Sequence, residues 1–311
     1  MPFEWPSSDQ ICYRLWRLRR LLALCLLVPA AVGLALALGG HLPVDHVALA
    51  LVLIGGLVMM HLVLFPNGTH ETLGLTLALS GLLAALPWVN GLGALAPADF
   101  AQAGLVFAVT GALVATGLGM AVLVQLLKVL TFIGPSLRLP LRAQIDVGCS
   151  VAVALQQFAI KPQIRRGRIL TGQADARGFF DVAVASAQDT DPDHAGQPLV
   201  GRATAKVLYN DSHSHAVMLL LPCGAISVSA LHATPQPAGC RVDLAELAGD
   251  FTLGMYVRHW LTDQQSDVMT EVADRIIGAE PRANALAHGV SFLSLAGLVL
   301  SPSEPVADRA K

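Results

Sequence analysis

The sequence predicts a membrane bundle of four α-helices followed by an α+β domain that has an antiparallel sheet and a long C-terminal helix. The first observation is composition: 54% of the residues are hydrophobic and 14% are charged, whereas soluble domains carry about 25% charge. The second is the uneven distribution of charge. Between Leu18 and Gly134 the charged residues are Arg19, Arg20, Asp45, Glu71, Asp99 and Lys128. The third observation is that ordinary polar composition resumes after Gly134.

Four apolar stretches are long enough to cross a bilayer, whose hydrocarbon core of about 30 Å needs roughly 20 helical residues. We expect these spans at residues 18–39, 46–65, 72–95 and 102–133. Turn-forming residues, Pro66-Asn67-Gly68 and Gly134-Pro135, follow the second and fourth stretches. The short connections predict antiparallel neighbours.

The distribution of basic residues predicts the orientation of the spans, because cytoplasmic flanks favour Lys and Arg. Arg14 and Arg17 precede the first span, while Arg138 and Arg142 follow the fourth. The loops expected on the opposite side contain Asp45 and Asp99 and no Lys or Arg. We therefore expect a multi-pass protein of the cytoplasmic (inner) membrane, with the N-terminal segment 1–17 and the domain 135–281 both in the cytoplasm.

The domain 135–281 shows alternating and helical periodicities in turn. They predict strands at 137–146, 179–187, 199–209, 215–221, 225–234 and 240–247, and helices at 151–160 and 252–277. Residues 282–311 would form an apolar interfacial helix and a polar tail; a fifth span at 285–300 is the alternative.

Two segments of this domain carry a family resemblance. They are Leu141-Arg142-Ala143-Gln144-Ile145-Asp146 followed by the short helix, and Gly239-Cys240-Arg241-Val242-Asp243-Leu244 before the long helix. This element order resembles the helix-grip fold of the START and polyketide-cyclase-like (SRPBCC) superfamily. The region from Lys161 to Phe179 departs from it, since strand signals are weak there.

The resemblance implies a hydrophobic ligand held between the sheet and the long helix. It would place Met255, Tyr256, His259 and Trp260 along the ligand. The alternative is that these residues form the core face of an ordinary packed helix. No catalytic residue follows from the resemblance.

Two further groups of residues suggest binding. Arg165, Arg166 and Arg168 are basic and close to the membrane, so we expect them to face anionic headgroups. His213 and His215 could point to one face of a strand and bind zinc with Asp211 or His232. Polar residues are also usual at such a hairpin tip, and we expect no metal.

No nucleotide-binding, protease or hydrolase motif occurs in the sequence, so it predicts no cofactor and no catalytic residue. The net charge of −2 does not favour nucleic acid. The first hypothesis is a membrane-anchored module that binds a lipid-like or other hydrophobic small molecule. A membrane enzyme acting on a lipid or isoprenoid is the second, and a scaffold for a membrane protein partner is the third. Membrane lipids are expected partners in each case.

Overall fold

The computed structural model describes residues 5–93, 101–190 and 198–283. The chain divides into two compact units. Of the described residues, the helical unit comprises 23–93 and 101–127, and the sheet unit comprises 5–22, 128–190 and 198–283. Residues 285–300, where a fifth span is the alternative, lie outside the described residues.

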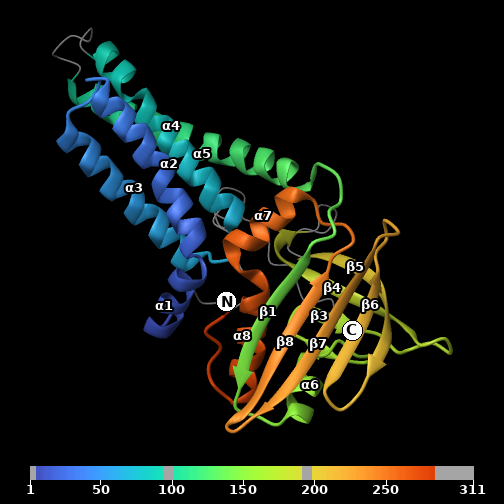
Figure 1. The fold of residues 1–311 in the computed structure, drawn as a ribbon. Coiled ribbons are helices and arrows are strands. Elements are labelled where there is room, and N and C mark those ends of the chain that lie inside the picture. The colour runs from blue at the N-terminus through green and yellow to red at the C-terminus, as the bar shows by residue number, and fades with distance from the viewer. Residues whose placement is uncertain (1–4, 94–100, 191–197, 284–311) are drawn as a thin grey trace, which may run out of the picture. The chain divides into compact units, whose positions relative to one another are not determined.

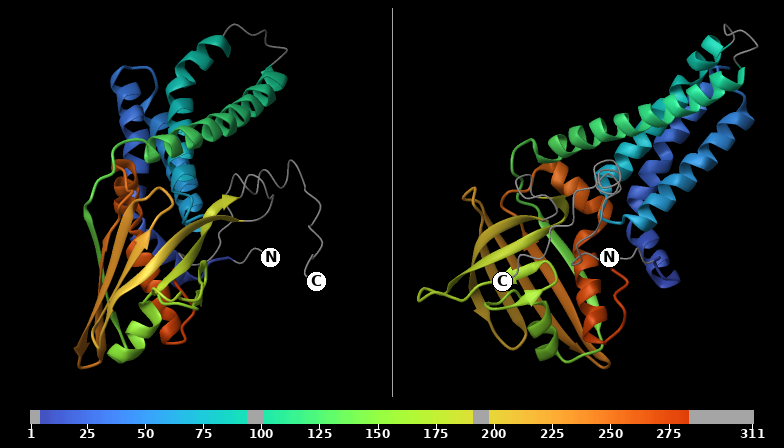
Figure 2. Two further views of the ribbon diagram at one scale, coloured as in Figure 1. Left: turned by 90° about the vertical axis from the view of Figure 1, so that its right-hand side faces the viewer. Right: turned by 180° about the vertical axis from the view of Figure 1, so that it is seen from behind.

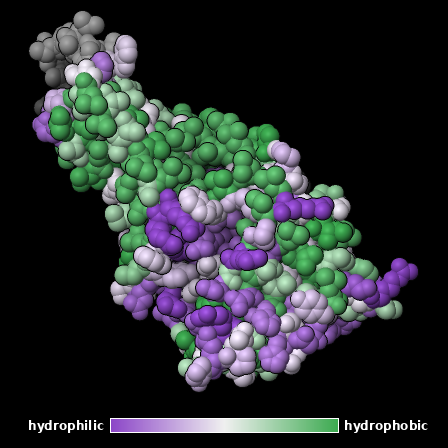
Figure 3. Space-filling model, in the orientation of Figure 1, coloured by the Kyte–Doolittle hydropathy of each residue, from purple (hydrophilic) through white to green (hydrophobic). Residues whose placement is uncertain are grey.

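Four helices run where the sequence predicts spans. They are α2 (Arg19–Leu38), α3 (Val44–Leu64), α4 (Thr69–Gly93) and α5 (Ala101–Phe132). Among the described residues, four segments are long and apolar enough to cross a membrane: Arg19–Leu38, Val44–Leu64, Thr69–Trp88 and Thr110–Phe132. No more than a third of the apolar part of each segment is buried in the molecule, and the helical surface in Figure 3 is mostly hydrophobic. Such surfaces require an apolar environment.

Several polar side chains of the helical unit have hydrogen-bond partners within it. The hydroxyl groups of Thr72, Thr76 and Ser80 on α4 each donate to the carbonyl oxygen four residues earlier. His61, which the sequence places near the end of the second span, is buried with its Nδ1 3.1 Å from Thr72 Oγ1. Its Nε2 lies 3.7 Å from a carboxylate oxygen of Glu71. These contacts join α3 to α4 beside their connecting turn.

The sheet unit is built on one antiparallel sheet of eight strands in the order β1-β8-β7-β6-β5-β4-β3-β2. The strands are β1 (Pro140–Val147), β2 (Arg165–Arg166), β3 (Ile169–Thr171), β4 (Phe179–Thr190), β5 (Pro198–Asn210), β6 (Ser214–Leu220), β7 (Ile226–Gln236) and β8 (Gly239–Leu247). The sheet curls from the flat β1–β8–β7 part towards β4 (Figures 1 and 2). The short strands β2 and β3 occupy the segment in which strand signals are weak.

Helices α6 (Val151–Phe158), α7 (Leu253–Thr262) and α8 (Gln264–Ile276) complete this unit. The prediction of one continuous helix at 252–277 is wrong, because the chain breaks between α7 and α8. Asp263 adopts a left-handed conformation there, with φ 47° and ψ 46°, which Asp tolerates better than most residues. Its carboxylate accepts a hydrogen bond of 2.9 Å from Ser266 Oγ.

The N-terminal segment also belongs to the sheet unit. It forms helix α1 (Ser8–Arg17), which begins with a capping box between Ser7 and Gln10. Gln10 Nε2 donates to Glu280 Oε1 at 3.1 Å, and the Arg282 guanidinium lies 5.9 Å from the Tyr13 ring centre. Helix α1 is therefore packed against the end of the α+β domain.

Candidate functional site

The two faces of the sheet differ in their neighbours. The inner face packs on α6 and α8 through a core that includes Val242, Leu231 and Met269. Towards the curled end, Phe180 and Val217 anchor a second apolar cluster. Side chains fill this face at both positions. We call the opposite side the outer face, and the candidate site lies on it.

A row of small residues crosses three strands of the outer face, β6, β7 and β8. Ala216 of β6, Ala230 of β7 and Ala245 of β8 lie directly opposite one another in the register. Arg142 of β1 continues the row beyond Ala245, and Tyr209 of β5 pairs with Ala216 at the other end. Since alanines project little from a sheet, the row leaves a depression between a cationic side chain and an aromatic ring.

A row of polar residues lies beside the alanines on the same face. Four polar residues on adjacent strands lie opposite one another in the register: Gln144 of β1 pairs with Asp243 of β8, Asp243 with His232 of β7, and His232 with Ser214 of β6. Ser214 Oγ and His232 Nδ1 lie 2.9 Å apart, within hydrogen-bond distance. The row therefore presents hydroxyl, imidazole, carboxylate and amide groups along one wall of the depression.

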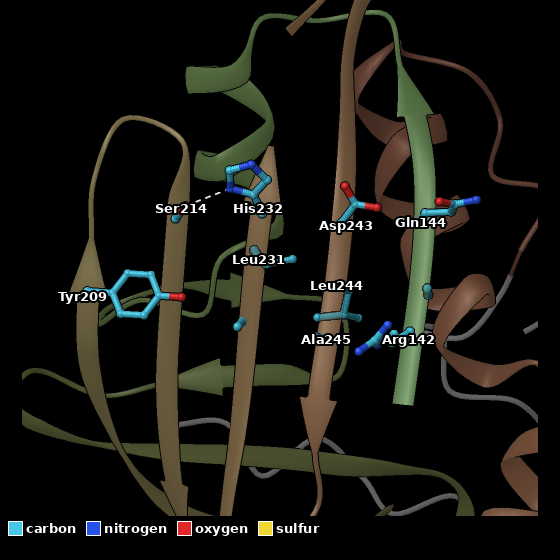
Figure 4. Close-up of a pocket in the computed structure, with 11 residues that line it drawn as sticks. Arg142, Gln144, Tyr209, Ser214, Leu231, His232, Asp243, Leu244 and Ala245 are labelled. Atoms are coloured by element: carbon cyan, nitrogen blue, oxygen red, sulfur yellow. Dashed lines mark hydrogen bonds between the residues drawn. The ribbon is translucent and has the colours of Figure 1, made fainter. Parts of the chain in front are cut away.

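Ala230 and Ala245, together with Arg142, Tyr209 and the polar row, line a hollow of about 670 Å³, which we call the groove. Ala216 is buried and does not line it. Figure 4 shows Tyr209 at one side, Arg142 at the other, and the Ser214–His232 hydrogen bond between neighbouring strands. The size falls within the range of small-molecule sites. A smaller hollow of about 320 Å³ lies further along the sheet and includes Asp181, Arg202 and Leu220.

The turn before β6 fixes one end of the polar row. Asp211 Oδ1 accepts hydrogen bonds from the backbone N–H groups of His213 and Ser214, at 2.8 and 2.7 Å. These two bonds hold the pKa of the Asp211 carboxyl below its ordinary value. The ionised carboxylate thus stabilises the turn that places Ser214 opposite His232.

The structure separates the four residues that the resemblance placed along a ligand. Tyr256 is buried, and its hydroxyl accepts from Leu139 N–H at 2.9 Å and lies within donating distance of the Leu137 and Leu139 carbonyl oxygens. His259 is half-buried with its ring 4.8 Å from that of Phe251. Met255 is also half-buried, whereas Trp260 is exposed. None of these residues lines the groove.

The three predicted membrane-facing arginines are not equivalent. Arg166 and Arg168 are half-buried and donate to the carbonyl oxygens of Gln157 and Ala185. Burial lowers the pKa of both guanidinium groups. Arg165 alone of the three is exposed. Two of the three side chains therefore hold the sheet unit together.

The candidate metal ligands do not converge. His215 is buried on the inner face, with Nε2 3.1 Å from Ile160 O and Nδ1 3.1 Å from Asn210 Oδ1. The His213 ring lies 2.8 Å from Ser212 Oγ at the turn. Within the ranges that the structure describes, no group of three His, Cys, Asp or Glu could hold a metal ion. The two histidines therefore have different structural roles.

Sequence reasoning missed the groove, although its signal is present in the strands. Three short segments each carry a small and a polar residue two positions apart: Ser214-His215-Ala216, Ala230-Leu231-His232 and Asp243-Leu244-Ala245. Residues two apart share a face of a strand. Only the register between the strands shows that the small residues align with one another and the polar residues do the same.

Comparisons with known proteins give a limited result. No model of a known family and no curated protein sequence matches this chain. Among solved structures, a protein from Mesorhizobium loti is similar at 11% identity with a TM-score of 0.32, over 45% of this chain and 96% of its own. A protein from Bordetella parapertussis is similar at 15% identity with a TM-score of 0.33, over 49% of this chain and 83% of its own.

The di-domain aromatase/cyclase StfQ of steffimycin biosynthesis is similar at 13% identity with a TM-score of 0.31. That match covers 58% of this chain and 60% of StfQ. Similarities at this level establish neither a family nor an activity.

Proposed function

We propose that this chain is a multi-pass membrane protein whose α+β domain binds a small amphipathic molecule in the groove of the outer face. The observation that carries the proposal is the alignment of three alanines on β6, β7 and β8 beside a polar row that crosses four strands. The alanines provide space and an apolar floor, while the polar row provides hydrogen bonds. Arg142 suits an anionic group of the ligand, and Tyr209 suits a flat apolar part.

This proposal changes the position of the ligand that the resemblance implied. A hydrophobic molecule between sheet and helix would occupy the space where Val242, Leu231 and Met269 pack together. The outer groove requires no displacement of the core. Its mixed lining favours a ligand with both polar and apolar parts over a purely hydrophobic one.

Anchoring in the membrane is the second part of the proposal. Four long apolar helices support it, because their exposed hydrophobic side chains would aggregate in water. Lipids are then the partners of the helical unit, and the positive-inside pattern supports a cytoplasmic sheet unit. A membrane protein partner is compatible with this arrangement and is what the scaffold hypothesis requires.

Native mass spectrometry of the full chain in lipid nanodiscs tests the binding proposal. Ala245→Trp fills the groove, and Ala183→Trp adds the same bulk to the smaller hollow on the same face of the sheet. We expect a co-purified small molecule in the wild type and in Ala183→Trp, and its loss in Ala245→Trp. Equal occupancy in all three proteins, or no bound molecule in the wild type, would contradict the proposal.

An enzyme that acts on the molecule in the groove is a second candidate. The Ser214–His232 hydrogen bond favours it, since a serine within 2.9 Å of an imidazole can pass its proton to the ring when it attacks an acyl group. A fluorophosphonate reagent tests for such a serine. Labelling of Ser214 that disappears in His232→Ala would support the enzyme, and no labelling at Ser214 would leave binding as the function.

A further inference from the structure

Helix α7 has an apolar stripe that the sheet unit leaves exposed. Leu253, Val257 and Trp260 are 62%, 46% and 59% exposed. Their spacing of four and three residues places them on one side of the helix. Tyr256 and Leu261 are buried on the neighbouring sides, so packing fixes the direction of the stripe.

The start of α7 is attached to the end of α5. Thr252 Oγ1 donates to the carbonyl oxygen of Thr131, one residue before the end of α5. Gly254 lies so close that a Cβ there would be 2.7 Å from Thr131 Cα. Because Thr131 belongs to the candidate span Thr110–Phe132, the first turn of α7 lies at the level where that span ends.

The other end of α7 is attached to the beginning of α2. Arg20 donates from Nη1 to the carbonyl oxygen of Trp260 at 2.8 Å, and its guanidinium lies 5.1 Å from the centre of the Trp260 ring. Arg20 is the second residue of the candidate span Arg19–Leu38. Helix α7 therefore bridges the ends of two spans that the positive-inside pattern assigns to the same side of the membrane.

A second tryptophan–arginine pair lies beside the same span. Trp16 is exposed, and the Arg19 guanidinium lies 4.6 Å from its ring centre. Tryptophan is enriched at the boundary between hydrocarbon and headgroups, and arginine adds attraction for anionic headgroups there. Two such pairs at the first residues of α2 mark the level of that boundary.

We propose that α7 is an interfacial helix that lies in the headgroup region of the bilayer and buries Leu253, Val257 and Trp260 among lipids. The proposal rests on the membrane insertion of the helical unit proposed above. It explains why an amphipathic helix carries its largest aromatic side chain on the exposed side. It also assigns Trp260 to the lipid surface and removes it from any ligand site in the domain.

Tryptophan quenching by brominated lipids tests the proposal on the full chain. The tryptophans Trp5, Trp16, Trp88 and Trp260 are all exposed, so replacing three of them by Phe leaves the core intact. One protein would keep only Trp260, and a second only Trp88, which lies in the candidate span Thr69–Trp88. A third would carry Leu208→Trp alone, at an exposed position of β5.

In vesicles we expect lipids brominated near the headgroup end of the acyl chains to remove most of the Trp260 emission. Trp88 would report insertion of the helical unit, and Leu208→Trp would stay unquenched. Quenching of Trp88 without quenching of Trp260 would overturn the interfacial helix and leave the spans in place. If Trp88 is also unquenched, membrane insertion and the interfacial helix both fail. Equal quenching of Trp260 and Leu208→Trp would overturn the specific placement of α7.

Discussion

Arg17 at the end of α1 and Asp267 in the first turn of α8 form an ion pair whose side chains are 4% and 1% exposed. Burial raises the pKa of the Asp267 carboxyl, and the nearby arginine opposes that shift. The pair connects the segment just before the first span to the helix at the end of the α+β domain. It explains why residues 1–22 belong to the sheet unit.

Breaking this pair from one side should destabilise the sheet unit more than removing both charges. Asp267→Leu leaves the Arg17 charge buried without its carboxylate and should cost about 3–5 kcal/mol of unfolding free energy. Arg17→Met combined with Asp267→Leu should cost less than Asp267→Leu alone. Chemical unfolding of the full chain, followed for the two single variants and the double variant, measures the coupling. Additive losses would show that the residues do not interact.

The Tyr256 hydroxyl should matter for stability and leave ligand occupancy unchanged. Tyr256→Phe removes its hydrogen bonds with the Leu137 and Leu139 backbone. We expect a loss of about 1–3 kcal/mol, because buried backbone groups lose a partner. Unfolding and native mass spectrometry of the same preparation measure the two properties. Loss of bound ligand with unchanged stability would return Tyr256 to the binding site.

His259 should make the sheet unit less stable in acid. Burial, with a smaller contribution from Arg258, lowers its pKa to about 4, compared with about 6.5 in an unfolded chain. The folded state therefore favours the neutral ring. Its contribution is complete above pH 6.5 and is lost as the pH falls through 4.

His259→Gln provides the matched variant, because it cannot titrate. Between pH 6.5 and 4 the wild type should lose on the order of 1–3 kcal/mol more than this variant. Thermal unfolding of both proteins across that range measures the difference. Parallel curves would show that the pKa of His259 is not lowered on folding.

His215 should be a structural residue that does not depend on metal. Its two ring nitrogens lie 3.1 Å from Asn210 Oδ1 and Ile160 O. We expect His215→Leu to lower the unfolding free energy by about 1–3 kcal/mol, and a chelator to leave the wild-type unfolding temperature unchanged. A chelator effect that His215→Leu abolishes would indicate a metal site.

The sequence predicted the four long apolar helices, α6 and most strands because their signals are local. Apolar runs of about twenty residues define a span without reference to other parts of the chain. The strand pairs around Asn210-Asp211-Ser212 and Gln236–Gly239 follow from turn residues between alternating segments. Helix α1 also has a local signal, because Ser7 and Gln10 form a capping box. The much stronger apolar run that follows this short helix obscures that signal in the sequence.

The break at Asp263 and the groove depended on information that is not local. Residues on both sides of Asp263 have helical periodicity, so only tertiary packing selects the left-handed turn that redirects α8. The groove depends on the register of four strands, and a shift of one residue would place Ala230 and Ala245 on the inner face. Of the four residues expected along a ligand, only Trp260 belongs to the exposed apolar stripe of α7, and the position of this stripe in the fold favours a lipid surface.

Thiol labelling in the membrane tests most directly the claim that a membrane bundle holds the α+β domain in the cytoplasm. Cys12 on α1 and Cys223 in the β6–β7 turn are exposed, whereas Cys25 and Cys240 are buried. A membrane-impermeant maleimide should label Cys12 and Cys223 in inside-out vesicles and leave them unlabelled in intact cells. Cys12→Ser and Cys223→Ser identify each signal. Labelling of Cys223 from outside intact cells, or release of the chain from membranes by alkaline carbonate, would contradict the account.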